Sequence, residues 1–413
     1  MSSNILSAEA VQISHPSKHI HTSIQLPSSK SESNRVLIIN ALCKKPCQLI
    51  NLSEARDTQT MIRLLASDEL LLDVIDAGTT MRFLTAYCTA INRETILTGS
   101  QRMCERPVQV LVEALRELGA DIEYMKNEGY PPIHIKKFKP TKNELYVRGD
   151  ISSQYISALL MIAPILPKGL KINLVGKVAS LPYIQMTLQL MQNFGVSHEW
   201  TGNSIYIAPQ EYHASSYSVE SDWSASSYWY SIVSLAHEAE VKLLGLKKDS
   251  LQGDAEIEKI MEYLGVSSVF QEDGVLLKKT RTVRDFEWDF THCPDLAQTV
   301  AVLGAAKGVN MKLTGLESLK IKETDRLIAV RDELAKFGIQ AKDVNDAELH
   351  MSPQSMQAPS AMIKTYKDHR MAMAFAPLAL LFEVSIEKPE VVEKSYPRFW
   401  EDLAKAGFQV LAK

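Results

Sequence analysis

The sequence of 413 residues lacks the short motifs that identify many cofactor-dependent enzymes. It contains no G-x-x-x-x-G-K-[ST] loop, no G-x-G-x-x-G fingerprint and no His/Cys cluster at metal-ligand spacing. These absences disfavour both a nucleotide-driven enzyme and a zinc enzyme. We therefore expect neither a cofactor nor a metal.

Cysteine, net charge and long apolar runs are also scarce. The five cysteines are odd in number and form no C-x-x-C pair, which fits a reducing compartment better than a disulfide framework. A net charge of −4 provides no global basic field to attract nucleic acid or an acidic membrane. The longest apolar run, Met371–Phe382, is interrupted by Pro377 and is too short to span a bilayer. We expect a cytoplasmic protein without nucleic-acid or membrane partners.

A repeat of about seventy residues organises the chain. Five amphipathic helical patterns end in glycine followed by an apolar residue, and by subtraction these glycines are 76, 70, 73 and 69 residues apart: Gly119, Gly195, Gly265, Gly338 and Gly407. Short β-type runs alternate with these helices. The pattern predicts an α/β protein of six repeat units, three in each of two domains. We place the domains at residues 27–251 and at residues 1–26 with 252–413.

Several predicted helices begin with small polar residues accompanied by cations. The stretch Pro27–Arg35 reads P-S-S-K-S-E-S-N-R and introduces a helix predicted from Asn34 to about Cys43. Cations are disfavoured beside the positive end of a helix dipole, whereas anions are favoured there. Lys30 and Arg35 therefore suggest an anion site, although a serine cap with solvated charges would also explain the pattern.

The other helix starts offer the same two interpretations. Lys322 and Arg326 are four residues apart, which predicts one helix face shared with Glu323, and an intrahelical ion pair would account for them equally well. Asp295 follows a proline and is first a good helix cap, and second a candidate base. His369 and Arg370 precede a very apolar helix.

Eight motifs occur in an order that resembles the 5-enolpyruvylshikimate-3-phosphate synthases, a family of enolpyruvyl transferases. The resemblance covers nearly the whole chain, and the ordered set is far more specific than any single motif. The motifs are Ser29–Arg35, Ala77–Arg82, Arg102–Pro107, Ser152–Gln154, Pro182–Ile184, Gln252–Asp254, Lys322–Arg326 and Asp368–Met373.

The resemblance implies transfer of the enolpyruvyl group of phosphoenolpyruvate to the 5-hydroxyl of shikimate 3-phosphate, with release of phosphate. It implies two domains of three βαβαββ units each, an active site in the interdomain cleft, no cofactor and a monomer. Because phosphate leaves by C–O cleavage, the chemistry needs a proton donor for the enol carbon and a carboxylate to accept the hydroxyl proton.

The resemblance also implies site residues by matching motif positions. The catalytic candidates are Lys30, Asp295 and Glu323. The residues expected to bind shikimate 3-phosphate are Lys30, Ser31, Arg35, Ser152, Ser153, Gln154, Ser180, Tyr183, Asp295, Ser318 and Lys322. Those expected to bind phosphoenolpyruvate are Lys30, Asp76, Gly78, Thr79, Arg106, Gln154, Arg326, His369, Arg370 and Lys394.

Some positions depart from the family pattern. Ser28 stands where glycine is common, Asp76 where asparagine is usual, and Ser318 where asparagine is frequent. The Asp76 carboxylate would repel phosphoenolpyruvate unless Arg82 or Arg106 pairs with it. Substrate affinity and the response to the inhibitor glyphosate are therefore open.

Two alternatives remain on the sequence alone. Cys104, two residues before Arg106, fits a related enolpyruvyl transferase that acts on UDP-N-acetylglucosamine and uses a loop cysteine. The departures at Asp76 and Ser318 would fit a non-catalytic paralogue that binds a phosphorylated ligand.

Overall fold

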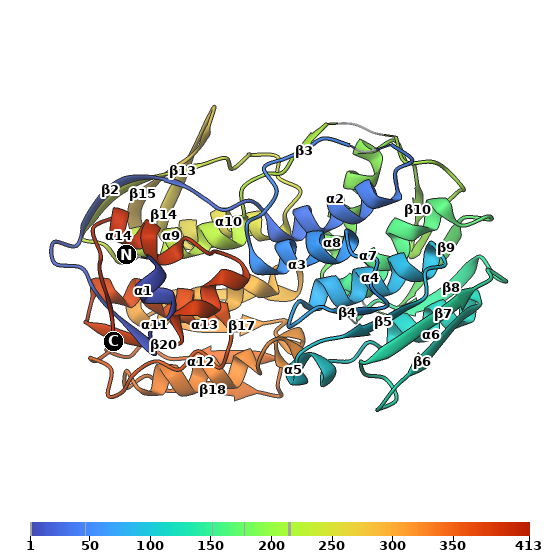
Figure 1. Ribbon diagram of the computed structural model, residues 1–413. Coiled ribbons are helices and arrows are strands. Elements are labelled where there is room, and N and C mark those ends of the chain that lie inside the picture. The colour runs from blue at the N-terminus through green and yellow to red at the C-terminus, as the bar shows by residue number, and fades with distance from the viewer. Residues whose placement is uncertain (1, 46, 151, 177, 214–215) are drawn as a thin grey trace. The chain divides into compact units, whose positions relative to one another are not determined.

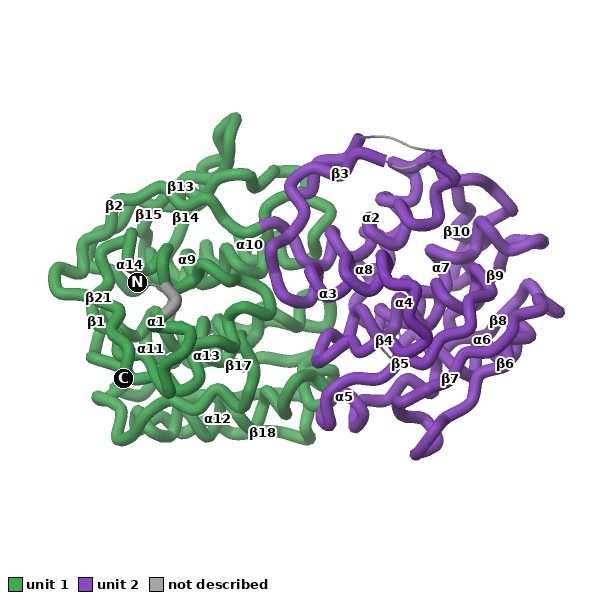
Figure 2. The backbone as a smooth tube through the Cα atoms, in the orientation of Figure 1, with its two compact units in different colours: residues 1–27, 220–413 green, residues 28–219 purple. Residues whose placement is uncertain are grey.

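The computed structural model describes residues 2–45, 47–150, 152–176, 178–213 and 216–413. The chain forms two compact units: unit 1 comprises residues 1–27 and 220–413, and unit 2 comprises residues 28–219 (Figure 2). The first boundary lies one residue from the expected one. The second lies between Val219 and Glu220 rather than after residue 251. The reason is that strand β13 (Glu238–Leu244) pairs in parallel with β2 (His19–Gln25), which places residues 220–251 with unit 1.

Unit 2 contains two four-stranded sheets and a two-stranded ladder (Figure 1). Its helices are α2 (Lys30–Leu42), α3 (Arg56–Leu65), α4 (Gly78–Ala90), α5 (Gln101–Cys104), α6 (Gln109–Leu118), α7 (Ser153–Ile162) and α8 (Leu181–Asn193), with the 3-10 helix η1 (Ala163–Ile165). Its strands are β3 (Leu49–Ile50), β4 (Leu71–Asp73), β5 (Thr95–Thr98), β6 (Ala120–Tyr124), β7 (Ile133–Phe138), β8 (Glu144–Arg148), β9 (Leu170–Val175), β10 (Glu199–Thr201), β11 (Ser204–Ile207) and β12 (Tyr217–Ser218).

Unit 1 contains two further four-stranded sheets and a three-stranded sheet. Its helices are α1 (Ser2–Leu6), α9 (Trp223–Leu235), α10 (Ile257–Tyr263), α11 (Ala297–Lys307), α12 (Arg326–Ala335), α13 (His369–Phe375) and α14 (Phe399–Lys405), and its 3-10 helices are η2 (Gly253–Glu256), η3 (Phe290–His292), η4 (Pro294–Leu296), η5 (Glu317–Ile321), η6 (Ala376–Leu380) and η7 (Pro389–Lys394). Its strands are β1 (Ala10–Ser14), β2, β13, β14 (Leu264–Gln271), β15 (Gly274–Thr282), β16 (Asp285–Asp289), β17 (Asn310–Thr314), β18 (Ala341–Val344), β19 (Glu348–Met351), β20 (Val384–Glu387) and β21 (Gln409–Ala412).

The four-stranded sheets repeat one topology. Their orders are β4-β5-β7-β6, β10-β11-β9-β8, β14-β15-β13-β2 and β16-β17-β19-β18. In each sheet the first two strands in sequence are parallel, and the final hairpin joins antiparallel. In three of the sheets a helix connects the parallel strands, as a crossover requires. Between β2 and β13 the chain instead runs through the whole of unit 2 and α9. The repeat of about seventy residues is thus a βαβαββ unit, which confirms the predicted α/β repeat fold. The first and last units are shortened, to the β3–β12 pair and the β20-β1-β21 sheet.

Apolar helices form the interior of each unit. In unit 1, α9, α11 and α13 are buried along almost their whole length, and α11 packs against both α9 and α13. In unit 2, α2, α4 and α7 pack against one another. Helices buried on all sides in this way hold their N-terminal residues in fixed positions. None of the helices in the described part of the chain is long and apolar enough to cross a membrane.

Candidate active site

The first helix of unit 2 begins earlier than the sequence predicted. Helix α2 starts at Lys30 rather than Asn34, because the hydroxyl of Ser29 caps it and accepts the N–H of Glu32 at 3.4 Å. Lys30 is therefore the first helical residue. Its ammonium lies 3.2 Å from the Asp57 carboxylate, which is buried in the first turn of α3. Asp57 offsets the unfavourable position of a cation at a helix N-terminus.

Arg35 lies in the interior of unit 2. Its guanidinium donates to the hydroxyls of Thr187 at 2.7 Å and Ser157 at 3.1 Å, and to the backbone oxygen of Ser31 at 2.9 Å. It also lies over the Phe83 ring. Burial lowers the pKa of Arg35 to about 10. This geometry fixes the first turn of α2 against α7 and α8, so direct contact between Arg35 and substrate stays a prediction.

Two arginines lie against Gly78 at the start of α4. A methyl group at Gly78 would lie 2.6 Å from Nη1 of Arg82 and 2.7 Å from Nη1 of Arg106. Arg82 donates to the Gly78 backbone oxygen at 2.8 Å. Gln154, in the first turn of α7, donates to the Thr79 hydroxyl at 3.2 Å. The structure thus joins the starts of α4 and α7, and brings together four of the predicted ligands of phosphoenolpyruvate.

Asp76 pairs with an arginine that sequence reasoning missed. Its carboxylate lies 3.0 Å from Nη2 of Arg56, the first residue of α3. An ion pair of this kind reduces the repulsion that a free carboxylate would exert on an anionic ligand. Arg56 had no sequence signal, because it lies 20 residues from Asp76.

The remaining predicted residues of unit 2 lie at two other helix starts. Ser152 caps α7 by accepting the N–H of Gln154, and the neighbouring Ser153 is buried. Ser180 precedes α8 with φ 53°, a left-handed conformation that costs a non-glycine residue energy and that clusters at functional sites. Tyr183 lies in the first turn of α8.

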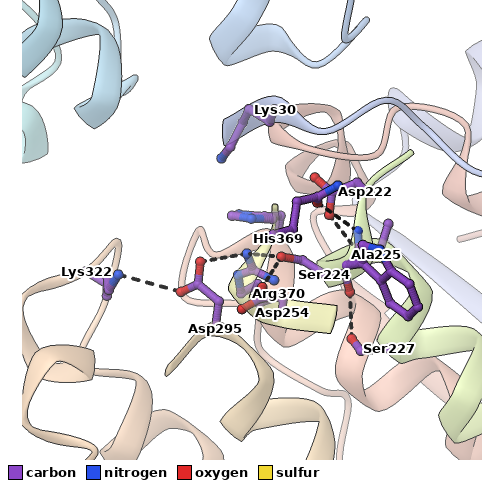
Figure 3. Close-up of polar contacts among 12 residues, drawn as sticks. Lys30, Asp222, Ser224, Ala225, Ser227, Asp254, Asp295, Lys322, His369 and Arg370 are labelled. Atoms are coloured by element: carbon purple, nitrogen blue, oxygen red, sulfur yellow. Dashed lines mark hydrogen bonds and ion pairs between the residues drawn. The ribbon is translucent and has the colours of Figure 1, made fainter. Parts of the chain in front are cut away.

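Asp295 is the centre of a charged network in unit 1 (Figure 3). Its carboxylate lies 2.9 Å from Nη1 of Arg326, 2.8 Å from Nη2 of Arg370 and 3.6 Å from Nζ of Lys322. Burial raises the pKa of Asp295, but Arg370, Lys322 and Arg326 together bring it well below its usual value. Burial also lowers the pKa of Lys322, which Asp295 opposes. Asp295 is therefore an ionised carboxylate.

Arg326 forms ion pairs with two carboxylates besides Asp295. Its Nε lies 2.7 Å from the buried Asp368 carboxylate, and its Nη2 lies 2.9 Å from Glu323. Burial alone would lower the pKa of Arg326, but the charges of Asp368, Glu323 and Asp295 raise it. Glu323 also lies 3.8 Å from the ammonium of Lys394, which is itself buried.

The helix face predicted for Lys322, Glu323 and Arg326 is wrong. Asp325 caps α12 by accepting the N–H of Ile328, so the helix begins only at Arg326. Lys322 precedes it in extended backbone at the end of η5. Their contacts with Asp295, and not an i,i+4 spacing, bring Lys322 and Arg326 together.

Arg370 reaches residues that sequence reasoning did not assign. It donates to the hydroxyls of Ser224 and Tyr228, each at 3.3 Å. Ser224 in turn donates to the buried carboxylate of Asp254 (Figure 3). Burial and the charge of Asp295 raise the pKa of Asp254 to about 6. The Gln252–Asp254 motif was the available signal for Asp254.

The last two predicted residues of unit 1 are less central. His369, the first residue of α13, is buried with Nδ1 3.5 Å from Asp368. Ser318 lies half-buried in η5. In the part of the chain that the structure describes, it does not belong to the ion-pair network around Asp295.

The chain matches the family model of EPSP synthase (3-phosphoshikimate 1-carboxyvinyltransferase) over residues 14–67 and 65–403. The chain belongs to the EPSP synthase family. A 3-phosphoshikimate 1-carboxyvinyltransferase of Bacteroides fragilis strain YCH46 is 49% identical over 402 residues, which cover 96% of this chain and 98% of the relative. One of Neisseria meningitidis serogroup B is 36% identical and covers 92% and 94% of the two chains.

A solved structure of EPSP synthase from Acinetobacter baumannii has the same fold. It superposes with a TM-score of 0.78 and covers 97% of this chain and 99% of the other, at 19% sequence identity. The motif-based expectation of the EPSP synthase family is therefore confirmed. Both curated relatives carry the phosphoshikimate name, so the alternative that acts on UDP-N-acetylglucosamine is not favoured.

Proposed function

We propose that the chain catalyses transfer of the enolpyruvyl group of phosphoenolpyruvate to the 5-hydroxyl of shikimate 3-phosphate. The products are 5-enolpyruvylshikimate 3-phosphate and phosphate, on the shikimate pathway to chorismate and the aromatic amino acids. The family membership supports this reaction. The structural observation that supports it is the ionised Asp295 carboxylate held among Arg326, Arg370 and Lys322.

Each unit supplies part of the binding machinery in this proposal. Unit 2 contributes cations and polar side chains at the starts of α2, α4 and α7, where helix N–H groups also favour anions. Unit 1 contributes the cations around Asp295. Arginine suits this task because its planar guanidinium binds carboxylate and phosphate oxygens in pairs.

The Asp295 network explains how base strength could depend on substrate. Without substrate, the three cations stabilise the carboxylate and make it a weak base. An anionic phosphoenolpyruvate bound by Arg326 and Arg370 shares their charge and raises the pKa of Asp295. The carboxylate then accepts the proton of the attacking 5-hydroxyl more readily.

The other half of the chemistry is proton donation to the enol carbon. Lys30 and Glu323 are the proposed donors. The Lys30 ammonium lies at the start of α2, 3.2 Å from Asp57, and the Glu323 carboxyl lies in a loop, 2.9 Å from Arg326. Addition of the hydroxyl and the proton gives a tetrahedral intermediate. Loss of phosphate by C–O cleavage, together with removal of a proton from the newly formed methyl group, then gives the enol ether.

The direct test mixes purified protein with both substrates and measures inorganic phosphate. We expect phosphate release only when phosphoenolpyruvate and shikimate 3-phosphate are both present. Lys30→Ala and Glu323→Ala should each lower kcat by about 10²–10⁴-fold, the usual range for general acid–base groups, while circular dichroism shows a folded protein.

Cys104→Ser is the matched control and should leave turnover nearly unchanged. Near-normal rates in both Lys30→Ala and Glu323→Ala would reject the assignment of the proton donors. Complete loss of activity in Cys104→Ser would instead favour the transferase that acts on UDP-N-acetylglucosamine.

The proposal extends to a monomer that acts in the cytoplasm. The family resemblance supports the monomer, and the scarce cysteines, which form no C-x-x-C pair, support a reducing compartment. Sedimentation velocity tests the first: a species of about twice the chain mass at micromolar concentration would contradict it.

A further inference from the structure

Two cysteines lie side by side at the end of α2, the helix that begins with Lys30. Cys43 is the residue that follows the last turn of α2, and Cys47 lies four positions further on. Their Sγ atoms are 3.4 Å apart. Both residues are partly exposed, whereas Cys88 and Cys293 are buried.

Asn40 holds this pair together. Its side-chain oxygen accepts the backbone N–H of Cys47 at 2.8 Å, and its backbone oxygen accepts the N–H of Cys43 at 3.2 Å. These two hydrogen bonds hold Cys43 and Cys47 beside the last turn of α2. A disulfide needs sulfurs about 2.05 Å apart, so the two Sγ atoms, now 3.4 Å apart, must move closer to form the bond.

The two thiols are chemically different. Cys43 donates to the backbone oxygen of Ile39 at 3.3 Å, and Cys47 donates to the Cys43 sulfur. Burial and this hydrogen bond raise the pKa of Cys43 to about 12. The raised pKa of Cys43 disfavours it as the first group to react with an oxidant, which leaves that step to Cys47.

We propose that Cys43 and Cys47 form a reversible disulfide that protects this segment from over-oxidation by peroxides. The Cys47 thiolate attacks hydrogen peroxide, breaks its O–O bond and becomes a sulfenic acid, while the released hydroxide takes up a proton to form water. The Cys43 thiol then attacks the sulfenic sulfur, and the displaced hydroxide leaves with the thiol proton as a second water. Two thiols are oxidised and one peroxide is reduced. A small-molecule thiol restores the pair by exchange.

Peptide mapping of the full-length protein tests the proposal. The protein is treated with a few equivalents of hydrogen peroxide, its remaining thiols are alkylated under denaturing conditions, and it is digested with trypsin. Trypsin cleaves between Lys44 and Lys45, so a Cys43–Cys47 disulfide joins the peptides 36–44 and 45–56. We expect this linked pair by mass spectrometry, its loss on treatment with dithiothreitol, and no comparable link at Cys104.

Cys43→Ser supplies the matched variant. Without its resolving thiol, Cys47 should advance to the sulfinic and sulfonic acids at peroxide doses that give only disulfide in the natural sequence. The reduced variant should keep its activity, because neither cysteine belongs to the candidate active site. Separate peptides with both thiols intact would overturn the proposal, as would equal over-oxidation of Cys47 in the two proteins.

Discussion

Replacing Asp368 by asparagine tests the charged network of unit 1 most sharply. The Asp368 carboxylate is fully buried and accepts Nε of Arg326 at 2.7 Å, Nη2 of Arg326 at 3.4 Å and the backbone N–H of Arg370 at 2.9 Å. Asp368→Asn keeps the shape but removes the charge that faces the buried guanidinium. Loss of one partner of a buried ion pair costs about 3–5 kcal/mol, because the other charge is left uncompensated.

The lower end of that range applies here. Arg326 keeps two other carboxylates, those of Asp295 and Glu323, so the guanidinium is not left alone. A loss of about 3 kcal/mol corresponds to a fall in Tm of about 6–12 °C for a unit of this size. Four of the five tryptophans lie in unit 1, so tryptophan fluorescence reports mainly on that unit: Trp223, Trp229, Trp288 and Trp400.

A surface aspartate provides the control for this experiment. Asp346 pairs with Lys320 at 2.6 Å, but its side chain is 63% exposed. Asp346→Asn should leave the unfolding midpoint nearly unchanged, because solvent screens exposed pairs. If Asp368→Asn unfolds at the same temperature as Asp346→Asn, the network does not stabilise unit 1.

Three further outcomes follow from the geometry. Gly78→Ala should raise KM for phosphoenolpyruvate at least about tenfold, because the added methyl group displaces the guanidinium groups of Arg82 and Arg106. A tenfold change corresponds to a loss of about 1.4 kcal/mol of binding free energy. Steady-state kinetics with saturating shikimate 3-phosphate would show it. Asp76→Asn should lower that KM, because it removes a negative charge and releases Arg56, whereas an unchanged KM would place Asp76 away from the ligand. Asp254 has a folded pKa of about 6 and an unfolded pKa of about 3.9, so its protonation stabilises the fold below about pH 4 and this contribution is lost as pH rises through about 6. Denaturant titrations of Asp254→Asn from about pH 4 to about pH 7 should therefore lack a decline of up to about 3 kcal/mol seen in the natural sequence, and parallel curves would contradict the raised pKa.

The sequence was sufficient for the repeats and for the glycines that follow several helices. Gly119 shows why: the predicted C-cap adopts φ 110° and ends α6, and the same local chemistry recurs in later units. Local rules failed where a long-range contact decides. The partners of Lys30 and Asp76, which are Asp57 and Arg56, lie 27 and 20 residues away, so no spacing rule identifies them.

Two other misses have different causes. Lys322 was placed on a helix because the i,i+4 rule assumes that a helix already exists, whereas the Asp325 cap starts it at Arg326. The motif match for Arg35 gives its identity but not its environment, and only the structure reveals that its guanidinium faces Thr187 and Ser157.

The fate of the bridging oxygen of phosphoenolpyruvate tests the proposed reaction most directly. The substrate is labelled with a heavy oxygen isotope between carbon and phosphorus and incubated with the protein and shikimate 3-phosphate. Mass spectrometry then locates the label. We expect it in the released phosphate, as C–O cleavage and enolpyruvyl transfer require. Label retained in the carbon product would show P–O cleavage and contradict the proposed function.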